Sequence, residues 1–95
     1  MSEEVKSSFA GVKPPPATLT SLVEIHALQV LIFTGRQPNP RTGKTEKNLD
    51  FAKHNIDMLE MLQEKTKGNL DEEEAGALEQ YLHLARMAYV EAAEK

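Results

Sequence analysis

Three histidines are the side chains of this sequence best suited to hold a ligand or a metal. They are His26, His54 and His83, and each lies in a different predicted helix. An acidic residue stands about one helical turn from two of them, since Asp57 follows His54 and Glu79 precedes His83. No pair has the Glu-x-x-His spacing of a di-iron bundle or the His-Glu-x-x-His spacing of a zinc protease. The pattern therefore favours locally hydrogen-bonded histidines, with a small-ligand or metal-binding helical module as the alternative function.

Other reactive side chains are not arranged for a recognisable reaction. The chain has no cysteine, which excludes a thiolate zinc site and a cysteine nucleophile. Gly43-Lys44-Thr45 is similar to the end of a phosphate-binding loop, but Pro38 stands where that motif requires glycine. Ser21 has no base at a useful spacing and is expected to cap a helix. We therefore predict that the protein is not an enzyme and has no catalytic residue, cofactor or bound metal.

The one basic region of the chain lies between the first two predicted helices. Residues 35–45 contain two glycines, two prolines and an asparagine, which predicts a loop. From residue 54 onward acidic residues predominate, with ten acidic and four basic residues. A basic loop can contact an acidic partner, although a solvated loop that balances the acidic helices is the simpler interpretation. The candidate partner-binding residues are Arg36, Arg41, Lys44 and Lys47.

Length and composition restrict the class of protein. A chain of 95 residues allows one small domain with a modest core. A formal net charge of −4 argues against binding to nucleic acid or to an anionic membrane surface. The longest uncharged apolar stretch, residues 25–35, is far shorter than the ~20 residues that cross a bilayer. Residues 1–17 predict a disordered tail without a secretory signal, and we expect a cytoplasmic protein.

Apolar periodicity predicts an all-α fold of three helices within a helical domain over residues 18–95. Ten of the fifteen residues in 19–33 are apolar, and two later segments repeat apolar residues at alternating spacings of three and four. The short link between the last two helices predicts that they fold back as an antiparallel αα-hairpin. The predicted helices cover about residues 19–34, 46–67 and 72–93.

Capping signals support the boundaries of these helices. Ser21 and Glu24 have the spacing of a capping box at the start of the first helix, and Asp71 and Glu74 have it at the start of the third. Gly68 follows the second helix, where a left-handed residue commonly ends a helix.

The first predicted helix carries apolar side chains around most of its circumference. Such a helix requires burial on several sides, which a three-helix monomer does not provide. A second copy is the simplest partner, so we expect a homodimer or a dimer of dimers with this helix at its centre. A monomer in which the hairpin covers the helix is the alternative. The predicted oligomer interface consists of Leu22, Ile25, Leu28, Leu31 and Ile32.

Two short runs resemble a small bacterial family known only as a domain of unknown function, family number 1844. The more specific run is Lys65-Thr66-Lys67-Gly68-Asn69-Leu70 before an acidic helix start, and the turn over residues 35–40 after an apolar helix supports it. The other run is Asn48-Leu49-Asp50-Phe51-Ala52, and the likeness extends over about residues 18–92. The resemblance implies a short, all-helical, cytosolic bacterial protein and supplies no activity. From the architecture we expect a non-enzymatic interaction or scaffold protein, a homo-oligomeric bundle that also engages an unidentified protein.

Overall fold

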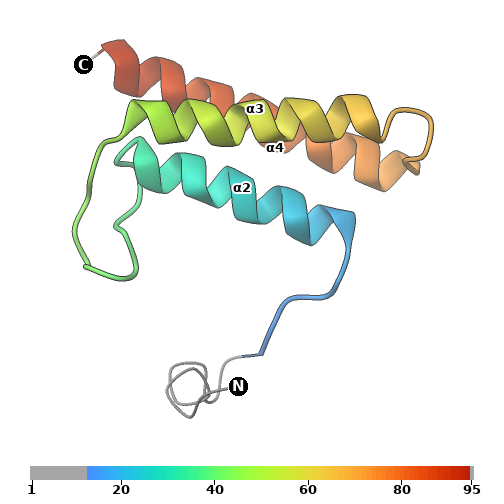
Figure 1. Cartoon of the computed structure of the whole chain (residues 1–95), viewed down its shortest axis with the longest axis horizontal. Helices are drawn as coiled ribbons and strands as arrows, with labels where there is room; N and C mark the ends of the chain where they lie inside the picture. Colours follow the sequence, from blue (N-terminus) through green and yellow to red (C-terminus); the bar gives the residue numbers. More distant parts are fainter. Residues whose placement is uncertain (1–12, 95) are drawn as a thin grey trace.

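The computed structural model describes residues 13–94 and contains three helices there, with no strand in that part of the chain (Figure 1). They are α2 (Leu19–Phe33), α3 (Leu49–Lys65) and α4 (Glu72–Glu94). The predicted all-α class and its three helices are confirmed. Most of the predicted N-terminal tail, residues 1–12, lies outside the described residues. No helix of the described part is both long enough and apolar enough to cross a membrane.

The three helices pack side by side, and each contacts the other two. The chain runs along α2, returns along α3 and reverses again along α4, so α3 is antiparallel to both neighbours (Figure 1). A tight turn joins α3 to α4, which confirms the predicted αα-hairpin. A longer connection joins α2 to α3 and projects beyond the C-terminal end of α2 (Figure 1).

Thr18, and not Ser21, caps the start of α2. The Oγ1 atom of Thr18 accepts a hydrogen bond from the backbone N–H of Ser21 at 3.0 Å. The predicted capping role of Ser21 is therefore wrong, because the helix begins at Leu19 and Ser21 lies in its first turn, where its own N–H is satisfied by Thr18. At the other end Gly35 has a φ of 82°, which lets the chain leave the helix after Thr34.

The hairpin follows its capping signals closely. Asn48 caps α3 by accepting a hydrogen bond from the N–H of Phe51 at 3.1 Å, so this helix begins three residues later than predicted. Gly68 has a φ of 88° in the turn after α3. Asp71 and Glu74 each accept from the other's backbone N–H, at 2.8 and 3.1 Å, so the predicted capping box is present.

The core within one chain is small. Eleven apolar residues are buried in the described part, and five of them are alanines. The face of α2 that packs on the hairpin carries Val23, Ala27 and Val30. Small residues in α3 and α4 let the three helices approach closely, and larger ones fill the centre. The buried apolar residues of the hairpin are Ala52, Ile56, Leu59, Leu78, Leu82, Ala85, Ala88 and Ala92.

Candidate functional site

A hydrogen-bonded pair joins α2 to α3 at the histidine that the sequence marks in the first helix. The Nδ1 atom of His26 lies 2.9 Å from the Oδ1 atom of Asn55. The Nδ2 atom of Asn55 donates to the backbone carbonyl of Phe51, also at 2.9 Å. Since Asn55 uses its amide hydrogens there, its oxygen must accept, and His26 must donate from Nδ1. The Nε2 atom of His26 makes no hydrogen bond within the described part of the chain.

A cavity of about 500 Å³ lies beside this pair, between α2, the connection after it and the first turns of α3. It brings two of the three predicted histidines, His26 and His54, to one place. Its apolar wall includes Phe33 and Phe51, whose rings stack with centroids 5.4 Å apart and an interplanar angle of 26°. The remaining lining residues are Gln29, Ile32, Asn39, Pro40, Arg41 and Asn55.

The third histidine is elsewhere. His83 is exposed on α4 and lines a shallow recess with Gly76, Glu79 and Gln80. Within residues 13–94, no group of three or more histidine, cysteine, aspartate or glutamate side chains is placed to hold a metal ion. A metal-binding module, one form of the alternative function, therefore has no set of ligands in this part of the chain. The other form, a module that binds a small ligand, depends on the cavity.

Two of the four candidate basic residues tie the connection to the end of α4. The Arg36 guanidinium pairs with the Glu91 carboxylate at 2.8 Å. The Nζ atom of Lys47 donates to the backbone carbonyl of Ala92 at 3.1 Å. That carbonyl is among the last four of α4, which lack helical partners, and a lysine charge suits the negative end of the helix dipole. Arg36 and Lys47 therefore have structural contacts that a protein partner would have to displace.

The other two candidate basic residues lie at the outer end of the connection and are exposed. The tip is shaped by its own backbone, since the N–H of Asn39 donates to the carbonyl of Lys44 at 2.8 Å and Asn39 Oδ1 accepts from the N–H of Arg41 at 2.9 Å. No ion pair involves Arg41 or Lys44 within residues 13–94. Their charges are therefore presented to solvent by an ordered turn.

The five predicted interface residues lie on the side of α2 that faces away from the core or at its margin. Leu22, Ile25 and Leu28 are 41%, 45% and 44% exposed. Leu31 is half-buried and packs against the core, and Ile32 is half-buried at the edge of the cavity. Three of the large apolar side chains of α2 thus point outward, and the three buried apolar positions of the helix hold the smaller Val23, Ala27 and Val30. This exposed set, Leu22, Ile25 and Leu28, is called the α2 outer face below.

One family of proteins shares this chain's sequence pattern. The sequence model of the family described as Domain of unknown function (DUF1844) matches residues 16–91. The chain belongs to this family. No curated protein and no solved structure matches this chain. The match covers the cavity and the α2 outer face, so both belong to the DUF1844 domain, and the family description assigns a role to neither.

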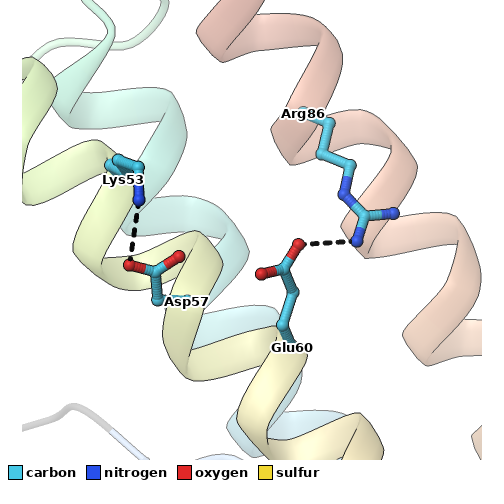
Figure 2. Close-up of polar contacts among 4 residues, drawn as sticks. All are labelled: Lys53, Asp57, Glu60 and Arg86. Atoms are coloured by element: carbon cyan, nitrogen blue, oxygen red, sulfur yellow. Dashed lines mark hydrogen bonds and ion pairs between the residues drawn. The ribbon is translucent and has the colours of Figure 1, made fainter.

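On the remaining side of the DUF1844 domain, charged residues pair across the hairpin. Arg86 of α4 reaches Glu60 of α3 at 2.7 Å, and Lys53 pairs with Asp57 along α3 at 3.4 Å (Figure 2). All four side chains are about half exposed or more, so each pair contributes roughly 0–1 kcal/mol. Charged side chains therefore lie among the exposed apolar residues on this side of the domain.

Sequence reasoning missed Asn55, the polar residue that orients His26. Asn55 is only 2% exposed and lies three residues after Ala52 and one before Ile56, inside the buried stripe of α3. An amide in such a stripe needs a hydrogen-bond partner from another element. The position of Asn55 on a buried helix face could have indicated this contact, because a buried amide and a histidine in the most apolar helix can satisfy each other's hydrogen-bonding needs.

Proposed function

We propose that this DUF1844 protein is a non-enzymatic interaction protein that forms a homodimer through the α2 outer face. The observation that supports it is the exposure of three large apolar side chains on one side of α2. Leu22, Ile25 and Leu28 are exposed, although the opposite side of the same helix packs against the hairpin through Val23, Ala27 and Val30 and, partly buried, Leu31 and Phe33. A helix that only had to cover the hairpin would not need large apolar residues on its outer side as well. Pairing of two copies removes these leucines and this isoleucine from water.

Charge favours a second copy over a charged partner. In a two-fold interface the same patch is used by both subunits, so any charge near the axis meets its own copy. Glu24 is the one formally charged residue of α2, and its carboxylate faces Tyr81 of α4, where it helps to raise the pKa of that phenol. The α2 outer face therefore meets itself without burying like charges, although the whole chain carries a net charge of −4.

The exposed apolar residues of α4 make a poorer self-contact. Leu84, Met87 and Val90 are exposed there, but Arg86 and Glu91 lie among them and are already paired with other elements. Burial of such charges costs more than the apolar contact returns unless each finds a new partner. The uncharged side of α2 is accordingly the face that we assign to self-association.

The length of α2 sets the geometry of the proposed dimer. Its fifteen residues span about 22 Å, and two such helices pack with axes about 8–10 Å apart. Ile25 lies near the middle of α2 on the outer face, so a two-fold axis through the helix centre brings it close to its copy. The connection after α2 projects past the helix end (Figure 1), which leaves Lys44 accessible to an acidic partner protein in the scaffold role.

A cross-linking experiment tests this geometry directly. The natural chain has no cysteine, so Ile25→Cys introduces a single thiol at the proposed centre. A disulfide requires Cα atoms within about 7 Å, so mild oxidation should produce covalent dimers of this variant. Met87→Cys, exposed on α4, is the matched control. Efficient cross-linking of Ile25→Cys alone supports the proposal, and equal yields from both variants or no covalent dimer would overturn it.

The cellular setting of the proposal comes from the family resemblance. We infer a bacterial, cytoplasmic protein, because the DUF1844 resemblance implies one and a cysteine-free chain suits a reducing compartment. Fractionation of a producing bacterium, with antibody detection of the untagged chain, checks this. Recovery in the soluble cytoplasmic fraction supports it, and recovery in the periplasm would contradict it.

A further inference from the structure

We propose that the cavity between α2, α3 and the connection is a binding site for a small carboxylate with a planar apolar body. The proposal does not depend on the homodimer, since the site is formed within one chain. About 500 Å³ lies in the usual range of small-ligand sites, about 300–1,000 Å³. The site is the place in the described structure where two histidines, an arginine and two phenylalanine rings meet.

The polar side of the cavity selects for an anion. None of its ten lining residues is an aspartate or glutamate, although the chain has fifteen acidic residues and eleven basic ones. Arg41 is one of the lining residues, and its guanidinium, which forms no ion pair within residues 13–94, is within reach of a ligand bound there. The acid nearest to the lining by hydrogen bonding is Glu46, which accepts from Asn39 and Thr42 at 3.5 and 3.2 Å. A ligand carboxylate is therefore the natural partner for Arg41, because a guanidinium binds a carboxylate through two parallel hydrogen bonds.

The apolar side of the cavity selects for a flat body. Phe51 is 55% exposed, and its ring stacks on Phe33 within the cavity wall. A half-exposed ring in a concave site offers a surface on which an aromatic group packs by offset stacking. Ile32 and Pro40 complete this apolar side.

The fixed orientation of His26 adds a specific polar contact. Its Nδ1–H is committed to Asn55, and Asn55 is held in turn by the carbonyl of Phe51. In the tautomer that donates from Nδ1, Nε2 carries no proton and can accept a hydrogen bond, on a side chain whose position is set by a buried amide. A hydroxyl or N–H on the ligand body can donate to Nε2 while the carboxylate contacts Arg41. His54, exposed at the rim, supplies a second imidazole.

The test uses 2-naphthoate as the probe and 2-naphthalenemethanol as its neutral counterpart. Each is titrated into ¹⁵N-labelled full-length protein, and amide shifts are followed at positions 26, 41, 51 and 54, with position 83 as a remote reference. A fragment of about thirteen non-hydrogen atoms at ordinary ligand efficiency gives a dissociation constant on the order of 1 mM. We expect saturable shifts at the cavity positions with naphthoate, and at least fivefold weaker binding of the alcohol.

Two substitutions on the connection distinguish the arginine contact from general charge. Arg41→Gln should weaken naphthoate binding about tenfold, because it removes a charge-assisted hydrogen bond. Lys44→Gln removes the same charge from an exposed residue that does not line the cavity, and should leave the affinity unchanged. Phe51→Leu keeps an apolar side chain, loses the stacking ring and should weaken binding several-fold. Absence of saturation by 10 mM (about ten times the expected constant), shifts confined to the α2 outer face, or equal losses in Arg41→Gln and Lys44→Gln would each overturn the proposal.

Discussion

The imidazole of His26 and the carboxamide of Asn55 connect α2 to α3 through a hydrogen bond of 2.9 Å. Asn55 also holds the carbonyl of Phe51, four residues earlier in its own helix. A polar pair thus lies beside the apolar core and fixes the rotation of α2 relative to α3 around the cavity. That orientation sends Leu22, Ile25 and Leu28 outward, so the pair and the α2 outer face are two consequences of one packing arrangement.

Replacement of Asn55 by alanine should destabilise the fold. The change leaves His26 without its partner and opens a small void, and we expect a loss of about 1–3 kcal/mol in the free energy of unfolding. Urea denaturation followed by circular dichroism measures it. Asn69→Ala, at an exposed position in the turn before α4, is the control and should stay within about 0.5 kcal/mol of wild type. Equal stabilities of the Asn55 and Asn69 variants would contradict the role given to the pair.

Substitution of alanine for glycine should change the stability in opposite directions at positions 68 and 76. Gly68→Ala should destabilise by about 1 kcal/mol, because residue 68 has a φ of 88° that an L-residue adopts with strain. Gly76→Ala lies within α4 and should stabilise by about 0.5–1 kcal/mol through helix propensity. An added Cβ meets no atom within 4 Å at either position, so sterics do not confuse the comparison. Melting temperatures that move in the same direction would refute the left-handed turn.

The capping box of α4 should contribute measurably to stability. Asp71→Ala removes the acceptor for the N–H of Glu74 and should cost about 1 kcal/mol. Asp71→Ser supplies another good capping oxygen and should recover most of that loss. Thermal or urea denaturation of the three proteins checks this, and an alanine variant as stable as the serine variant would show that the cap contributes nothing.

The raised pKa of Tyr81 predicts that the free energy of unfolding falls in alkaline solution. Burial raises the pKa of its phenol above the ordinary 10.0, and the carboxylate of Glu24, which repels the phenolate and accepts its hydrogen bond, raises that pKa further. The folded state therefore holds this proton more tightly than the unfolded state. Its contribution is complete below pH 10 and is lost as pH rises through the folded pKa.

The corresponding measurement is the free energy of unfolding between pH 9 and pH 12, a window placed around the ordinary pKa of 10.0. Tyr81→Phe should show a shallower decline than wild type across this window, since it lacks the titrating group. Glu24→Gln should show an intermediate slope, because burial still acts on Tyr81. Identical slopes for wild type and Tyr81→Phe would contradict the raised pKa.

Local signals predicted much of the hairpin, because its boundaries depend on residues close together in the chain. Gly68 and the pair Asp71 and Glu74 act within a few residues, so the turn and the start of α4 follow from sequence. The same kind of reasoning assigned the cap of α2 to Ser21, because Ser21 and Glu24 have the spacing of a capping box. The helix begins earlier, at Leu19, after Thr18 with an extended backbone of φ −127° and ψ 160°.

Contacts between distant residues were beyond such reasoning. Lys47 reaches the carbonyl of Ala92 across 45 positions, and His26 meets Asn55 across 29. Both depend on the rotation of each helix about its axis, which apolar periodicity determines only to within about a residue. The meeting of His26 and His54 in one cavity, and the separation of His83 from them, follow from that rotation.

Native mass spectrometry of the untagged protein tests self-association through α2 most directly. We expect wild type at twice the chain mass of 10.6 kDa. Ile25→Asp should be found at the monomer mass with the helicity of wild type, because it puts a charge on the α2 outer face without touching the core. Leu31 is less suitable, since it packs against that core. Met87→Asp, on the exposed side of α4, should remain a dimer. Wild type found only as a folded monomer, or Ile25→Asp found as a dimer, would contradict the proposed interface.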